Sequence, residues 1–124
     1  MCTAHHAAHS HCPIRLPNRT AAAPLLRRCD ISCGDDHVAI KSGLNDLARA
    51  AHPQFASVNV TVRHNLLRAG MGIAVGSETA GGIDGVIVEH NVFIGEGWSV
   101  ALHVKTAPQR GNAVENVCFR HNVV

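Results

Sequence analysis

An eight-residue pattern occurs three times in the second half of the chain, and it constrains the fold more than any other feature. Its copies are VTVRHNLL at residues 60–67, VIVEHNVF at 86–93 and VCFRHNVV at 117–124, so they begin 26 and 31 residues apart. Apolar and polar residues alternate within each copy, which predicts a strand. A degenerate earlier copy occupies residues 26–31. Strands that recur at this spacing predict a solenoid, in which stacked units share one core.

A second apolar strand is expected after each of the first three copies. These segments are VAIK at residues 38–41, IAVG at 73–76 and ALHVK at 101–105, and a turn that contains glycine precedes each of them. Strand, turn, strand and loop in this order predict an all-β fold, a parallel β-helix of about three to four coils. Residues 44–51 could form a short helix, and they fit a loop insertion equally well.

Stacked coils would place equivalent residues in columns along the solenoid. We expect the apolar members of the copies to stack inward: Val60, Val62, Val86, Val88, Val117 and Phe119. One asparagine of each copy should lie at a bend and join a hydrogen-bonded ladder: Asn65, Asn91 and Asn122. The histidines that precede them are interpreted as one repeated coil position and not as a metal site: His64, His90 and His121.

Composition excludes several classes of protein. The net charge of the 124 residues is only +2, with Lys and Arg scattered along the chain, which argues against a nucleic-acid partner. No apolar run approaches 18 residues, so no transmembrane helix is expected. The five cysteines are an odd number and include no Cys-x-x-Cys pair, so a fully paired disulfide framework is not expected.

The first 28 residues differ from the rest of the chain, and we assign residues 1–28 and 29–124 to separate units. The first segment has no clear period and contains Cys2, His5, His6, His9, His11 and Cys12. These residue types are zinc ligands, but their spacing fits no known finger, so a disordered or wrongly assigned His-rich tail is the preferred interpretation. The segment also lacks the apolar core of a signal peptide. Either the protein is not exported, or this chain lacks its true N-terminus.

The stretch CGDDHVAIKSG at residues 33–43 is the strongest candidate for chemistry. Asp35 and Asp36 follow a glycine at an expected turn, where both side chains can point outward. Two carboxylates held close together acquire different proton affinities, which suits a general acid beside a general base. Taken alone, however, Gly-Asp-Asp is more typical of ordinary turn chemistry.

Three further stretches follow in order: GMGIAVGSETAGG at residues 70–82, LHVKTAP at 102–108 and RGNAVENV at 110–117. With residues 33–43 they resemble the motifs of the polygalacturonases, the pectin-cleaving glycoside hydrolases of family 28, over about residues 26–124. That resemblance implies a right-handed parallel β-helix and inverting hydrolysis of α-1,4-galacturonosyl linkages in pectin. It also implies an extracellular or cell-wall location and no cofactor or metal.

The resemblance assigns roles residue by residue. Asp35 matches the general acid that protonates the leaving oxygen, and Asp36 matches a carboxylate that activates water. Lys105 matches the lysine that holds a galacturonate carboxylate, and His103 replaces the usual arginine. His103 and Lys105 alternate with inward-pointing residues, so both should lie on the outer face of their strand, on the same side as Asp35 and Asp36.

Departures from the family pattern favour a second hypothesis. Met71 replaces the histidine between two glycines, and the Asn-Thr-Asp motif expected one coil before Asp35 is absent. Only part of the family's solenoid is visible, so we expect a fragment whose open coil ends promote self-association. Such a chain would only bind acidic polysaccharide. A metal-binding His-rich protein is a third hypothesis, and a pectate-lyase-like β-helix is disfavoured because no acidic calcium constellation is visible.

Overall fold

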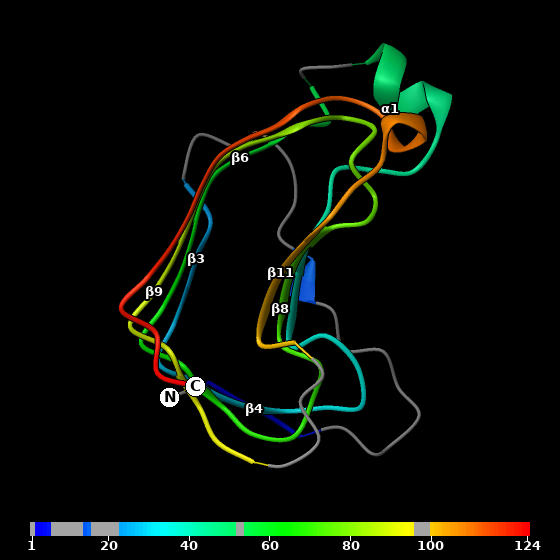
Figure 1. Cartoon of the computed structure of the whole chain (residues 1–124). Helices are drawn as coiled ribbons and strands as arrows, with labels where there is room; N and C mark the ends of the chain where they lie inside the picture. Colours follow the sequence, from blue (N-terminus) through cyan, green and yellow to red (C-terminus); the bar gives the residue numbers. More distant parts are fainter. Residues whose placement is uncertain (1, 6–13, 16–22, 52–53, 96–99) are drawn as a thin grey trace.

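The computed structural model describes residues 2–5, 14–15, 23–51, 54–95 and 100–124 (Figure 1). Within these residues, twelve strands form three parallel sheets of four strands each. The first sheet contains β1 (Cys2–His5), β4 (Cys29–Ser32), β7 (Leu66–Leu67) and β10 (Val92–Phe93). The second contains β2 (Ile14–Arg15), β5 (Val38–Ile40), β8 (Ile73–Gly76) and β11 (Leu102–Lys105). The third contains β3 (Leu25–Arg27), β6 (Ser57–Arg63), β9 (Ile83–Glu89) and β12 (Val114–Arg120).

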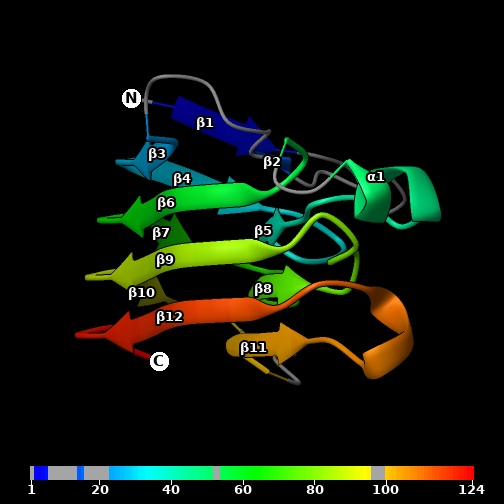
Figure 2. The same ribbon diagram turned by 90° about the horizontal axis from the view of Figure 1, so that it is seen from above.

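Consecutive strands of the chain belong to different sheets, so each coil contributes one strand to every sheet. The strands of successive coils lie side by side in all three sheets (Figure 2). This is the strand order of a parallel β-helix, and the prediction of an all-β fold of parallel strands is confirmed. The three sheets end at β10, β11 and β12 on one side. Self-association through such ends stays a prediction.

Stacked aliphatic side chains fill the interior of the coils. Val60 and Val62 of β6 are fully buried, as are their register partners Val86 and Val88 of β9. β-branched side chains suit such columns because they pack closely against the neighbouring strand. Phe119 packs against the same core but remains partly exposed, since β12 is the last strand of its sheet.

A bend divides each copy of the repeat, so the single strand expected for residues 60–67 is two strands, β6 and β7. The histidine at each bend has a left-handed backbone, with φ between 53° and 56° at His64, His90 and His121. The asparagines that follow form the predicted ladder: the backbone N–H and Nδ2 of Asn65 donate to Oδ1 of Asn91 at 3.1 and 2.9 Å. Asn91 donates to Asn122 in the same way, at 3.1 and 3.0 Å. The ladder thus satisfies backbone groups that the bend leaves without a strand partner.

Strand pairing extends into the segment before residue 29. β1 pairs with β4, β2 with β5 and β3 with β6, all parallel. Residues 1, 6–13 and 16–22 lie outside the described residues, and with them most of the His- and Cys-rich cluster. The boundary at residue 28 stays a prediction.

One short α-helix, α1 (Asp46–Ala50), lies between β5 and β6 in the described part of the chain. Asn45 caps it, because Oδ1 of Asn45 accepts from the backbone N–H of Ala48 at 3.1 Å. Of the two alternatives left open for residues 44–51, a short helix is the one that the structure contains. No helix within the described ranges is long and apolar enough to cross a membrane.

Candidate active site

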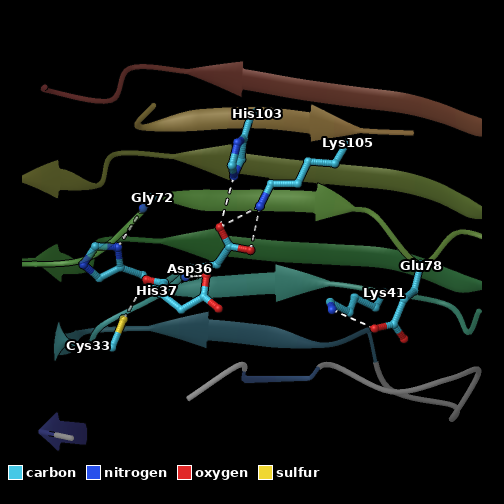
Figure 3. A network of polar contacts seen from close by, with 9 residues as sticks. Cys33, Asp36, His37, Lys41, Gly72, Glu78, His103 and Lys105 are labelled. Carbon is cyan, nitrogen blue, oxygen red and sulfur yellow. Dashed lines mark hydrogen bonds and ion pairs between the residues drawn. The ribbon is translucent and has the colours of Figure 1, made fainter. Parts of the chain in front are cut away.

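The candidate site lies on the outer face of the second sheet, where β5, β8 and β11 run side by side. The turn at residues 33–37 leads into β5, and His103 and Lys105 belong to β11, two coils further on (Figure 3). Two coils correspond to about 10 Å along the solenoid. Small residues occupy the strand between them: Ala74 and Gly76 of β8 are the register partners of His103 and Lys105. They leave room for both long side chains to reach across β8.

Asp36 is the centre of a polar cluster. Nζ of Lys105 lies 3.0 Å from both carboxylate oxygens of Asp36, and Nε2 of His103 lies 3.2 Å from Oδ1 (Figure 3). The side chain of Asp36 is 12% exposed, against 19% for His103 and 38% for Lys105. The structure therefore brings these three residues together on one face, and His103 and Lys105 share that face as the alternation of β11 predicts. Their chemical roles stay predictions.

Asp35 is held by the backbone around it. Its Oδ1 accepts from the N–H of Asp36 at 2.8 Å, and its carbonyl oxygen accepts from the N–H of Met71 at 2.8 Å. The thiol of Cys33 donates to the same carbonyl at 3.1 Å. The aspartate turn is thus tied to residues 70–72 of the next coil, and Asp35 keeps a partly exposed side chain.

His37 is a site residue that sequence reasoning did not identify. Its ring is fully buried under the 70–72 loop, where Nδ1 accepts from the N–H of Gly72 at 3.1 Å (Figure 3). Any Cβ at Gly70 would collide with this ring. The available signal was Gly70, one of the two glycines around Met71, because it permits the close approach. The side chain of Met71 itself is 43% exposed.

A second ion pair ties the loops that follow β5 and β8. Nζ of Lys41 lies 2.8 Å from Oε1 of Glu78, and both side chains are about a quarter exposed. Both residues belong to stretches that carry the family resemblance, but their pairing was not predicted. Among the residues that the structure describes, no group of three or more His, Cys, Asp or Glu is placed to hold a metal ion.

The chain should become less stable as the pH is lowered, because of His37. Burial lowers the pKa of His37 below its usual value. Hydrogen bonds with nearby backbone groups and the charge of Asp36 raise the pKa, but the effect of burial is larger. The unfolded chain therefore binds the proton first as pH falls. The contribution of the neutral, buried His37 to the free energy of unfolding is fully present above about pH 6.5. It is lost as the pH falls toward the lowered pKa that His37 has in the folded state. We expect the free energy of unfolding in urea to decrease between about pH 7.5 and about pH 5.

His37→Asn should remove this part of the pH dependence, because an amide can accept the Gly72 N–H but does not titrate. His121→Gln is the control, since His121 is exposed and lies far from the loop in sequence. Equal pH slopes for wild type and His37→Asn would contradict the prediction.

Comparison with known proteins gives a consistent result. Residues 23–124 match the family model for glycosyl hydrolases family 28. A polygalacturonase of Ralstonia nicotianae is 34% identical over 91 residues, which are 72% of this chain and 15% of that protein. An exo-poly-α-D-galacturonosidase of Dickeya chrysanthemi is 32% identical over 92 residues, or 73% of this chain and 14% of that protein. The chain thus spans about 15% of the length of these relatives. No solved structure gives a significant match.

Proposed function

The chain belongs to glycosyl hydrolases family 28, and we propose that it is part of a pectin-degrading glycosidase that hydrolyses α-1,4-galacturonosyl linkages. The observation that carries this proposal is the cluster of Asp36, His103 and Lys105 beside Asp35, within the residues that match the family. Asp35 and Asp36 suit acid–base chemistry at a glycosidic bond, and Lys105 suits the carboxylate of an acidic sugar. By the same resemblance we propose that the protein acts outside the cell, on cell-wall pectin.

In the proposed reaction, Asp35 donates its proton to the glycosidic oxygen as the bond between that oxygen and the anomeric carbon breaks. A water molecule attacks the anomeric carbon from the opposite face and loses its proton to Asp36. The configuration is inverted, and one linkage and one water yield two shorter chains. The positions of the two aspartates, which are adjacent in the sequence but held by different contacts, support separate roles.

Lys105 and His103 would hold the carboxylate of a galacturonate residue. In the structure both side chains contact Asp36 and lie on the outer face of the second sheet. A sugar carboxylate offers them the same pair of oxygen acceptors. Lys105 supplies a constant charge, whereas His103 supplies one only when it is protonated, unlike an arginine at that position.

The alternative function is binding of acidic polysaccharide without hydrolysis. Met71 supports it, because its thioether cannot replace the hydrogen bonds of the histidine that the family has between the two glycines. His103 supports it as well, since a histidine lacks the bidentate donors of arginine. Turnover and binding must therefore be measured separately.

Asp35→Asn should lower the release of reducing ends from polygalacturonate by about 10²–10⁴-fold, because the amide cannot donate the proton. Binding of oligogalacturonate should change little. Lys105→Ala should instead weaken binding, since it removes the constant positive charge. Asp46→Asn is the matched control: it makes the same chemical change on the exposed side of α1.

Two outcomes would overturn parts of the proposal. If the wild-type chain binds oligogalacturonate but releases no reducing ends, the binding function stands and hydrolysis by this chain does not. If Asp35→Asn and Asp46→Asn are equally active, Asp35 is not the general acid.

A further inference from the structure

Two neighbouring columns of side chains run along one corner of the coils, where the strands of the third sheet end. The first column contains Arg27, Arg63, Glu89 and Arg120, which are register partners across β3, β6, β9 and β12. The second contains the residues that follow them: Arg28, His64, His90 and His121. All four members of the second column have a left-handed backbone, with φ between 53° and 56°. We call these eight residues the basic ridge.

The three histidines of the basic ridge stack on one another. The ring centroids of His64 and His90 are 5.2 Å apart with an interplanar angle of 6°, and those of His90 and His121 are 5.1 Å apart at 14°. All three residues are exposed. Asn65 and Asn91 of the ladder on their inner side are buried and hydrogen-bonded, whereas the three histidines face the surface of the corner. The repeat therefore produces a regular row of imidazoles, one for each of three coils.

Positive charge is concentrated at this corner. Residues 25–32, 61–68, 87–94 and 118–124 contain five arginines and two carboxylates, a net charge of +3, whereas the whole chain carries +2. One carboxylate, Asp30, pairs with Arg68 at 2.6 Å. The other, Glu89, lies 2.7 Å from Arg120 and 3.9 Å from Arg63. The rest of the chain is therefore slightly negative, and the corner attracts anions.

We propose that the basic ridge is a second binding site for acidic polysaccharide, which it binds more tightly when its histidines are protonated. The identity of the glycan rests on the proposed function. The ridge is separate from the candidate active site, since it lies across the coils from β8 and β11 (Figure 1). The spacing of 5.1–5.2 Å between neighbouring imidazole rings is comparable to the length of one sugar in a glycan chain. Carboxylates on successive sugars can therefore meet histidines of successive coils.

The charges around the histidines determine how the ridge responds to pH. The groups beside the histidine column are Arg28 within it, the neighbouring column of Arg27, Arg63, Glu89 and Arg120, and the uncharged asparagine ladder inside it. The hydrogen bond from Arg120, together with the charges of His90 and Arg63, lowers the pKa of Glu89 despite some desolvation. Glu89 and the arginines therefore keep their charges over the range in which histidines titrate, between about pH 5 and 8.

The test measures the affinity for polygalacturonate at about pH 5 and about pH 8, at constant salt, for the wild type and the triple variant His64→Gln, His90→Gln, His121→Gln. Wild type should bind about tenfold more tightly at the lower pH than the triple variant, and the two should bind similarly at the higher pH. His103 is present in both proteins, so its effect cancels. Lys105→Ala is the control in the candidate active site. It should retain the difference in affinity between the two pH values, because the ridge produces that difference.

Glu89→Gln guards against loss of folding in the triple variant. Removing the one negative charge of the ridge should strengthen binding about twofold or more at both pH values, which an unfolded protein would not do. A wild-type pH profile in the triple variant, together with unchanged binding by Glu89→Gln, would overturn the proposal. So would tighter binding of single-stranded DNA than of polygalacturonate, or equal binding of a neutral glucan. If neither the wild type nor any variant releases reducing ends, the proposed hydrolysis is wrong. If the ridge variants nevertheless bind as described, the proposal that the ridge binds acidic polysaccharide is still supported.

Discussion

Replacing Asn91 with alanine should destabilise the chain by about 3–5 kcal/mol, because it removes the central member of the asparagine ladder. Oδ1 of Asn91 accepts two hydrogen bonds from Asn65, and Nδ2 donates to the carbonyl of Val62 at 3.1 Å. Alanine leaves these buried groups without partners in the interior of the coils, where water cannot easily replace them. Equilibrium unfolding in urea, followed by circular dichroism, measures the difference.

Asn122→Ala is the matched control for Asn91→Ala. Asn122 makes equivalent contacts with Asn91 and Val88, but it is partly exposed on the last coil. Water can satisfy the groups that it leaves, so we expect a loss of about 1 kcal/mol. Equal losses for the two variants would show that burial of the ladder does not determine its contribution.

Gly76→Ala should destabilise the chain by about 3 kcal/mol or more and should displace β11. Gly76 has φ +103°, and a Cβ there would collide with the backbone carbonyl of its register partner Lys105. The added Cβ is attached to the backbone of β8 and meets a backbone atom of β11, and neither can rotate away. The two strands must therefore separate to relieve the collision. Because Lys105 reaches Asp36 across β8, the same variant should weaken binding of oligogalacturonate.

Gly85→Ala separates backbone strain from collision. Gly85 also has a left-handed backbone, with φ +73°, but the nearest atom to an added Cβ is the side-chain oxygen of Asn59, at 3.0 Å. That side chain can move, so we expect only the strain, about 1 kcal/mol, and no change in oligogalacturonate binding. If Gly76→Ala is no more damaging than Gly85→Ala in either assay, close pairing of β8 with β11 does not determine the site.

The repeat was sufficient to predict most of the fold. A coil that stacks on copies of itself converts one sequence position into a column, so the alternation of Val60 and Val62 also determines what β9 and β12 bury. The same reasoning predicted the ladder of Asn65, Asn91 and Asn122, since an amide at a repeated bend meets another amide one coil away. It also placed His103 and Lys105 on one face, because alternation in a strand is a local property.

Only the tertiary structure decided the side-chain contacts between coils that involve turns and loops of different sequence and length. The contact of Lys105 with Asp36 requires two coils to align across β8, and the small residues Ala74 and Gly76 allow it. The position of His37 beneath Gly70 depends on how the 70–72 loop folds over the aspartate turn. Neither follows from periodicity, because turns and loops between the strands do not repeat. Sequence alone therefore determined which residues form columns, and the packing of the non-repeating turns decided which side chains of different columns meet.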